Sequence, residues 1–248
     1  MKKQAEYIKS INKEKAREEM ILPFLLVFVF FAGIVLLANY ILIWRLQWIG
    51  AVFAFIGIIV LASLLYFYRD PERVPPAGKN DILCPADGKI VGVEKVTGAP
   101  GLKGSFIRIS IFLNVHNVHI QRMPFAAKIL DIKTVPGRLL PAFHSEAGEK
   151  NRQNIYIIKG ELTAVVKQIA GVLVHRPVAW VEAGDTLSAG DRFGMITFGS
   201  RVELFVPATC NITALEDDIV YAGTSILGKI CKEKEKPNRP SKRSQKPK

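Results

Sequence analysis

The stretch Gly190–Pro207 reads GDRFGMITFGSRVELFVP. Within it, two runs of β-branched and large apolar residues, MITF and RVELFV, flank the pair Gly199-Ser200. Such runs predict extended segments, and a glycine where two extended segments meet permits a left-handed or strained backbone that other residues resist. Taken alone, the pair therefore predicts a turn or a bulge in a β-sheet.

The same pattern continues on both sides of this stretch. Short runs rich in Val, Ile, Leu and Phe, punctuated by glycine and proline, fill residues 81–228. Frequent turn signals between such runs are typical of an all-β domain, so we predict a mainly-β domain with a barrel-sandwich-like core and little helix. Within this domain, residues 144–153 are the best candidate for a helix or a mobile loop beside a functional site. The predicted turn glycines are Gly88, Gly184, Gly190 and Gly194.

Two apolar segments precede the β-rich part. Residues 21–44 and 46–68 contain almost no polar side chains, and each is long enough as a helix to cross a hydrocarbon core of about 30 Å. The connection is short, so residues 21–68 are predicted to form an antiparallel transmembrane hairpin rather than the buried helical hairpin of a soluble protein. A cleaved signal peptide is not expected, because the first span starts late and has no small-residue cleavage site.

Charge and cysteine content indicate where the domain lies. The formal net charge of +12 indicates an anionic partner, and the hairpin favours a membrane surface over nucleic acid. The polar leader, residues 1–20, and the Pro-rich linker, residues 69–80, carry more Lys and Arg than the single Arg45 between the spans, so both termini and the domain are predicted to be cytoplasmic. Three unpaired cysteines fit a reducing compartment. Residues 229–248, with nine Lys or Arg, are predicted to form a disordered basic tail.

Four blocks of sequence together resemble one family. They are CPADGKI at 84–90, NVHNVHIQRMP at 114–124, VPGRLLPAF at 135–143 and FGSRVELFVP at 198–207. They are similar to the short, membrane-anchored form of phosphatidylserine decarboxylase, over roughly residues 68–211. The resemblance implies that the hydroxyl of Ser200 attacks the carbonyl of Gly199, that the chain is cut between them, and that Ser200 becomes a pyruvoyl group.

The resemblance also implies the reaction and its site. The pyruvoyl cofactor would accept the amine of phosphatidylserine and the electrons released with carbon dioxide, giving phosphatidylethanolamine. Asp87 would belong to the self-cleavage machinery, although by itself it resembles an ordinary turn aspartate. His119 would take the proton of Ser200, although a strand histidine is often a core residue. Asp87, His119 and Ser200 thus form a predicted serine-activating set, and Arg122 and Arg201 are predicted to bind the substrate carboxylate or phosphate.

The pair His116 and His119 could suggest a metal site. The β-branched residues Val115, Val118 and Ile120 predict a strand here, on which residues three apart point to opposite faces. We therefore predict no metal, with His119 and Gln121 on one face and His116 at the surface or behind the site.

Several points stay open at this stage. Asn117 and the pair Arg152-Gln153 depart from the residues that the family often has there, which affects the orientation of His119 and the substrate loop. The alternatives are a membrane-tethered binding or carrier domain in which Ser200 is only a turn residue, a phosphotransferase that uses His119, and a decarboxylase of an ether-linked serine phospholipid. The two chains of the cut precursor are expected to stay associated. Whether the protein forms a homo-oligomer is left open.

Overall fold

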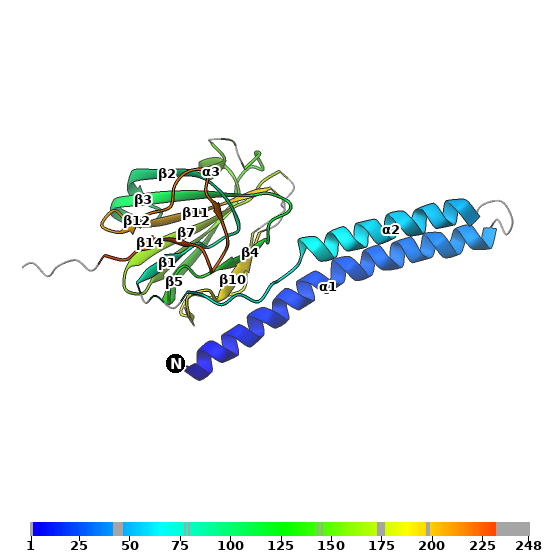
Figure 1. Ribbon diagram of the computed structural model, residues 1–248, viewed down its shortest axis with the longest axis horizontal. Coiled ribbons are helices and arrows are strands. Elements are labelled where there is room, and N and C mark those ends of the chain that lie inside the picture. Colours follow the sequence, from blue (N-terminus) through cyan, green and yellow to red (C-terminus); the bar gives the residue numbers. More distant parts are fainter. Residues whose placement is uncertain are drawn as a thin grey trace, which may run out of the picture.

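Two long helices lie side by side and project from a β-rich body (Figure 1). The structure, a computed structural model, describes residues 2–41, 47–76, 78, 80–142, 144, 146–172, 177–196 and 199–231. Helix α1 (Lys2–Ile41) includes the predicted leader and the first apolar segment without a break, and it passes beside strands β9 and β10. Helix α2 (Gln47–Phe67) contains the second apolar segment.

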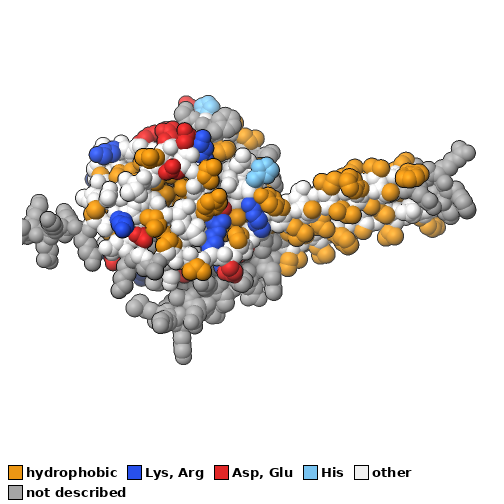
Figure 2. Space-filling model, viewed as in Figure 1, with side chains coloured by type: hydrophobic (Ala, Val, Ile, Leu, Met, Phe, Trp, Pro, Cys, Tyr) orange, Lys and Arg blue, Asp and Glu red, His pale blue; other side chains and the backbone are white. Residues whose placement is uncertain are grey.

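Both helices are long and apolar enough to cross a bilayer. Their apolar parts, Ile21–Tyr40 and Trp48–Phe67, have mean hydropathies of 3.0 and 2.6, and most of their side chains are exposed. Figure 2 shows hydrophobic side chains along the described part of the helix pair, where a soluble protein would expose charges. Exposed apolar surface of this extent needs a nonpolar environment. The predicted connection at Arg45 lies outside the described residues, as do residues 42–44 and 46 at the ends of the two predicted spans.

The rest of the chain is mainly antiparallel β-structure, as predicted. The strands are β1 (Asp81–Leu83), β2 (Gly88–Ala99), β3 (Leu102–Leu113), β4 (Ile120–Arg122), β5 (Ala127–Val135), β6 (Gln153–Lys159), β7 (Thr163–Ile169), β8 (Val178–Ala179), β9 (Thr186–Leu187), β10 (Arg192–Met195), β11 (Ser200–Pro207), β12 (Asn211–Ile212), β13 (Ile219–Val220) and β14 (Ile226–Lys229). An eight-stranded sheet has the order β13-β2-β3-β11-β7-β6-β5-β9, and two three-stranded sheets have the orders β1-β14-β12 and β4-β10-β8.

Strand β11 lies in the middle of the large sheet and is buried on both faces. Val202, Leu204 and Val206 point into the main core, whereas Phe205 packs with Phe106 and Val165 on the opposite face. The run RVELFV alternates polar and apolar residues as far as Leu204, and Phe205 breaks the alternation because the second face of β11 is also buried. Burial on both faces also places the residue at the start of β11, Ser200, inside the protein.

The prediction of a strand around His116 and His119 is wrong in part. Residues 115–119 form a turn and a short loop, and only Ile120–Arg122 is strand. The backbone N–H of Asn114 donates to Oδ1 of Asn117 at 2.7 Å, and the N–H of Asn117 donates to the carbonyl of Asn114 at 3.0 Å. Asparagine side chains stabilise turns in this way and here outweigh the β-branched neighbours.

Two of the four predicted turn glycines, Gly184 and Gly190, lie in turns, with φ values of 105° and 79°. Gly88 is instead the first residue of β2, where its φ is 155°. Gly194 instead lies within β10, and its missing side chain lets the carbonyl of Val178 come close. The predicted turn at Gly194 is therefore wrong, because a close approach of strands also selects glycine.

The segment predicted as a helix or loop beside the site contains one helical turn, α3 (Ala147–Lys150). It is fastened to the large sheet, since Nζ of Lys167 donates to the carbonyl of Gly148 at 2.6 Å. At the other end of the chain, β14 ends at Lys229, and residues 232–248 of the predicted tail lie outside the described residues.

Gly88 is a position where alanine is expected to destabilise the domain strongly. A Cβ there would collide with the carbonyl oxygen of Phe112 on β3, and its φ of 155° is strained for any other residue. Backbone strain alone costs about 1–3 kcal/mol. Gly88→Ala should lower the urea midpoint of unfolding, whereas Gly92→Ala on the same strand, where only a flexible glutamate lies within 4 Å, should change it little. Equal midpoints for the two variants would contradict the close β2–β3 approach.

Candidate active site

The predicted residues Asp87 and Ser200 lie at one end of the large sheet. Asp87 immediately precedes β2, and Ser200 begins β11. Both strands pair with the end of β3, because Lys89 lies opposite Phe112 and Ser200 lies opposite Leu113. Residues 113 positions apart in the chain are thus brought to the same edge of three adjacent strands.

His119 is carried to the same edge by strand pairing. Residues 114–119 lead from β3 to β4, and the chain also passes from β10 to β11. Because β3 pairs with β11 and β4 pairs with β10, both connections join the same two sheets. The backbone N–H of Ile196, just after β10, donates to the carbonyl of His119 at 3.1 Å. The fold therefore carries Asp87, His119 and Ser200 to the same end of the sheets, and among the described contacts no hydrogen bond joins their side chains.

Ser200 has the surroundings of a reactive residue. Its side chain is fully buried, and Oγ has no hydrogen-bond partner among the described residues. A buried polar atom without a partner costs about 1–3 kcal/mol, and a catalytic role is one reason for which such an atom is retained. The preceding Gly199 has a left-handed backbone, with φ of 59°, and among the described residues beyond its chain neighbours no atom lies within 4 Å of the position that a Cβ would take.

The imidazole of His119 is buried. Only 1% of the residue is exposed, and the ring of Phe67 lies against the imidazole with 4.2 Å between ring centroids and 31° between planes. Burial lowers the pKa of His119 to about 4, and the charge of Arg69 acts in the same direction, while the Asn117 backbone and the Asp87 carboxylate act in the opposite one. Neither ring nitrogen has a partner of good hydrogen-bond geometry in the described part of the chain. The imidazole is thus neutral near pH 7 and able to accept a proton.

Asp87 is held by a side chain that the sequence did not single out for the site. Nη1 and Nη2 of Arg73 donate to its two carboxylate oxygens at 2.5 and 2.8 Å, and the backbone N–H of Ala222 donates to Oδ1 at 2.7 Å. Among the described contacts Asp87 is bonded to Arg73 and Ala222 rather than to His119. It therefore acts on His119 through its charge in this state.

A chain of buried amides supports the backbone of His119. Nε2 of Gln121 donates to the His119 carbonyl at 2.8 Å, and Oε1 of Gln121 accepts from Nε2 of Gln168 at 2.7 Å. The hydroxyl of Tyr156 in turn donates to Oε1 of Gln168 at 2.8 Å. These contacts connect the histidine loop to strands β6 and β7. His116, by contrast, is exposed, as predicted.

The two predicted substrate-binding arginines are engaged with carboxylates. Nη2 of Arg122 donates to Oδ1 of Asp70 at 3.1 Å and to the carbonyl of Pro71 at 2.9 Å. Arg201 lies on the face of β11 opposite to Ser200, with Nη2 3.1 Å from Oε1 of Glu203. Their role as substrate ligands stays a prediction, since both guanidinium groups have protein partners here.

The residues that the sequence interpretation missed lie between the second apolar helix and the β-domain. Phe67, Asp70 and Arg73 contact residues of the site, although this region was interpreted as the end of a span and a stiff linker. The signal was the run RDPER at 69–73, in which four of five residues are charged. A segment that only connects a membrane helix to a domain does not require so many charged residues.

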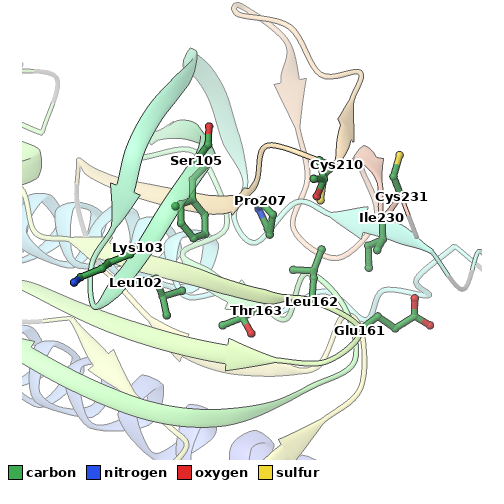
Figure 3. A pocket seen from close by; sticks show the side chains of 13 residues that line it. Leu102, Lys103, Ser105, Glu161, Leu162, Thr163, Pro207, Cys210, Ile230 and Cys231 are labelled. Carbon is green, nitrogen blue, oxygen red and sulfur yellow. The ribbon is translucent and has the colours of Figure 1, made fainter. Parts of the chain in front are cut away.

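A cavity of about 860 Å³ lies at the opposite end of the domain and is open to its surface (Figure 3). Pro207, at its edge, is seven residues along β11 from Ser200, which is roughly 23 Å at about 3.3 Å per residue. Lys103 and Glu161 are its charged lining residues, and the free thiols Cys210 and Cys231 also line it. The cavity is therefore separate from the edge that carries Ser200.

Comparison with known proteins shows the family of this chain. Residues 60–228 match the phosphatidylserine decarboxylase family. The phosphatidylserine decarboxylase proenzyme of Desulfotalea psychrophila is 40% identical over 183 residues, covering 72% of this chain and 85% of the relative. That of Syntrophus aciditrophicus is 38% identical over 181 residues, covering 71% and 84%, and that of Burkholderia ambifaria is 38% identical over 174 residues, covering 69% and 81%. The matched region contains Asp87, His119, Gly199 and Ser200, and the chain belongs to the phosphatidylserine decarboxylase family.

Proposed function

We propose that this protein is an enzyme that decarboxylates phosphatidylserine to phosphatidylethanolamine, after cutting its own chain between Gly199 and Ser200. The observation that carries the proposal is the buried, unpartnered hydroxyl of Ser200 next to a left-handed glycine, at the sheet edge that also holds the neutral His119. The proenzyme names of the relatives fit a precursor that is processed.

In the proposed self-cleavage, His119 takes the proton of the Ser200 hydroxyl while Oγ adds to the carbonyl carbon of Gly199. The C–N bond then breaks, the amine nitrogen takes the proton from His119, and an ester joins the two residues. Loss of the Cα proton of Ser200 breaks the Cβ–Oγ bond and releases the Gly199 carboxylate. Water replaces the nitrogen of the remaining dehydroalanine, ammonia leaves, and a pyruvoyl group ends the new chain.

The residues around Ser200 fit such a group. Ser200 is buried, and its Oγ has no hydrogen-bond partner among the described residues that would hold it away from the Gly199 carbonyl. When present, the pyruvoyl group supplies a carbonyl that takes up the substrate amine and accepts the electron pair released with carbon dioxide. The chain's own residues bury that carbonyl, and His119 is placed to hold or deliver a proton.

Strand pairing supports continued association of the two chains after the cut. The carboxy-terminal piece contains β11–β14, and β11 pairs with both β3 and β7 of the amino-terminal piece. The new terminus would then stay beside His119 without a covalent link. A homo-oligomer is not needed for this.

The position of the site suits a lipid substrate. The second apolar helix ends at Phe67, whose ring covers His119, so the site would lie where α2 leaves the bilayer. Removing acyl chains from a bilayer costs about 0.8 kcal/mol per methylene, and an enzyme at the surface avoids that cost. The protein would cross the membrane twice, and the positive charges of the Lys-rich leader, Arg69 and Arg73 favour a cytoplasmic location for both termini and the β-domain.

The decarboxylation is tested with the purified protein in mixed micelles. With carboxyl-labelled phosphatidylserine, we expect labelled carbon dioxide and an equal amount of phosphatidylethanolamine. An ether-linked serine phospholipid in a parallel assay tests whether the acyl linkage matters. Intact substrate with a fully processed enzyme would contradict the proposed reaction, and an uncleaved, inactive chain would favour the tethered non-catalytic domain.

The pH dependence of self-cleavage follows from His119. Because burial lowers its pKa to about 4, the base is neutral across pH 5.5–8, and the cleavage rate should be flat there and fall only in stronger acid. The contribution of His119 to folding stability follows the same direction. This contribution is fully present above about pH 6.5 and is lost as the pH falls from about 6.5 to about 4, because the unfolded chain binds the proton more readily. To measure the cleavage rate, cell-free translation is stopped and the precursor is transferred to buffers of set pH. A midpoint near pH 6.5 in the plot of rate against pH would contradict a buried base.

A further inference from the structure

The segment Phe67–Arg73, here called the exit segment, joins the second apolar helix to the β-domain. Its seven residues, FYRDPER, contact three separate parts of the site. Each contact uses a different side chain and reaches a different loop or strand, so the segment is packed into the domain along its length. Arg73 is 11% exposed in its side chain and Asp70 10%, which is unusual for charged residues of a linker.

The first contact is with the loop that carries Asp87. Arg73 forms a bidentate ion pair with the carboxylate, and its Nη1 also donates to the carbonyl of Ala222 at 2.8 Å. The backbone N–H of Ala222 reaches the same carboxylate. Arg73 therefore ties the aspartate loop to the chain before β14 and fixes the orientation of the carboxylate in a way that lysine, a point charge, cannot match.

The second contact is with the paired strands β4 and β10. Arg122 and Arg192 lie opposite each other in this ladder, and both are almost fully buried. Asp70 lies between them, 3.1 Å from Nη2 of Arg122 and 2.7 Å from Nε of Arg192. Two adjacent buried cations require an anion, and the exit segment supplies it.

The third contact is with the histidine loop. Phe67 covers the His119 ring and belongs to an apolar cluster with Val118, Ile120, Trp180 and Met195. Nη2 of Arg69 donates to the carbonyl of His116 at 2.6 Å, and the same guanidinium lies over the ring of Tyr66 on α2. The end of the helix and the turn that precedes His119 are thus fastened together.

We propose that the exit segment is a positioning element of the active site, in which Arg73 orients Asp87 and Phe67 keeps water from His119, so that self-cleavage depends on how the membrane helix ends. This inference rests on the proposed function. The membrane anchor then has a second role, because the same seven residues that leave the bilayer also contact Asp87 and His119.

The pH profile of self-cleavage tests Phe67. Phe67→Ala admits water to the imidazole, which removes much of the burial that lowers its pKa, while Arg69, Asp87 and the Asn117 backbone still act on the ring. We expect the acid limb of the rate to move up by at least one pH unit, into the range of pH 5–6.5. Phe67→Leu keeps the site covered and should leave the limb at its wild-type position. Phe55→Ala, on the exposed face of the same helix, is the matched control.

The cleavage rate at pH 7.5 tests Arg73. Arg73→Met should slow cleavage by 100-fold or more, and Arg73→Lys, which keeps the charge but not the two parallel bonds, by about tenfold. Val74→Ala, at an 88% exposed neighbour, should cleave at the wild-type rate. Thermal unfolding of each variant in the Ser200→Ala background shows whether the precursor is folded. If Arg73→Met does not fold, the pH profiles of the Phe67 variants test the positioning role on their own.

The outcomes separate this inference from the function on which it rests. A wild-type chain that stays uncut at every pH overturns the proposed function and this inference with it. Wild-type cleavage, with an unmoved acid limb in Phe67→Ala and a normal rate in folded Arg73→Met, overturns the positioning role alone. A rate that drops equally at all pH values in Phe67→Ala also overturns it, because a purely structural effect would not move the limb.

Discussion

Ser200→Ala is expected to leave the chain at its full length and to abolish decarboxylation. The hydroxyl that would attack Gly199 is gone, and the pyruvoyl group cannot form from alanine. In the wild type, denatured mass spectrometry should find residues 1–199 and a 49-residue remainder, 200–248, that is lighter by one ammonia than a simple hydrolysis product. That remainder should also resist amino-terminal sequencing, because a pyruvoyl group has no amine.

A matched control for this experiment is Ser105→Ala, at an exposed serine near the other end of β3. It should be processed like the wild type. A single full-length species in both the wild type and Ser200→Ala would remove the cofactor and favour the non-catalytic domain. Cleavage at another bond, seen in all three proteins, would point to an external protease.

His119→Gln is expected to slow self-cleavage by about 10²–10⁴-fold, the usual contribution of a positioned base. Glutamine is close in size to histidine but has no group that accepts a proton near pH 7. The fold should tolerate the change, because the imidazole ring makes no good hydrogen bond in the described structure and its backbone carbonyl remains bonded to Gln121. Gel analysis of the precursor over time measures the rate.

His144→Gln serves as the comparison, since His144 is exposed. It should be processed at the wild-type rate. If His119→Gln matched it, the base would have to be another group, and the unusual burial of His119 would need a different explanation. A phosphorylated His119 in the wild type would instead support the phosphotransferase alternative.

The amino-acid sequence by itself determined the class of the fold, and together with the family resemblance it pointed to the bond that we propose is cut. Apolar runs of more than twenty residues need a nonpolar environment, whatever follows them. Short Val-, Ile- and Phe-rich runs between turn residues form strands because local propensity and burial agree. The Gly199-Ser200 pair needed the resemblance as well, since a local pattern cannot tell a reactive serine from a turn serine.

Only the tertiary structure decided how the site is held. Arg192 and Asp70 are 122 positions apart, and Asp87 and Ala222 are 135 apart, so their contacts depend on which strands pair. The same dependence explains the burial of Arg122 in an ion pair with Asp70. The turn at 114–119 has a local cause instead, since the hydrogen bonds between Asn114 and Asn117 outweigh the β-branched neighbours. From the sequence alone, charged residues in a short linker are expected to be solvated, because a buried ion pair leaves no periodic pattern in the sequence that would reveal it. Their burial follows from where the domain places their partners.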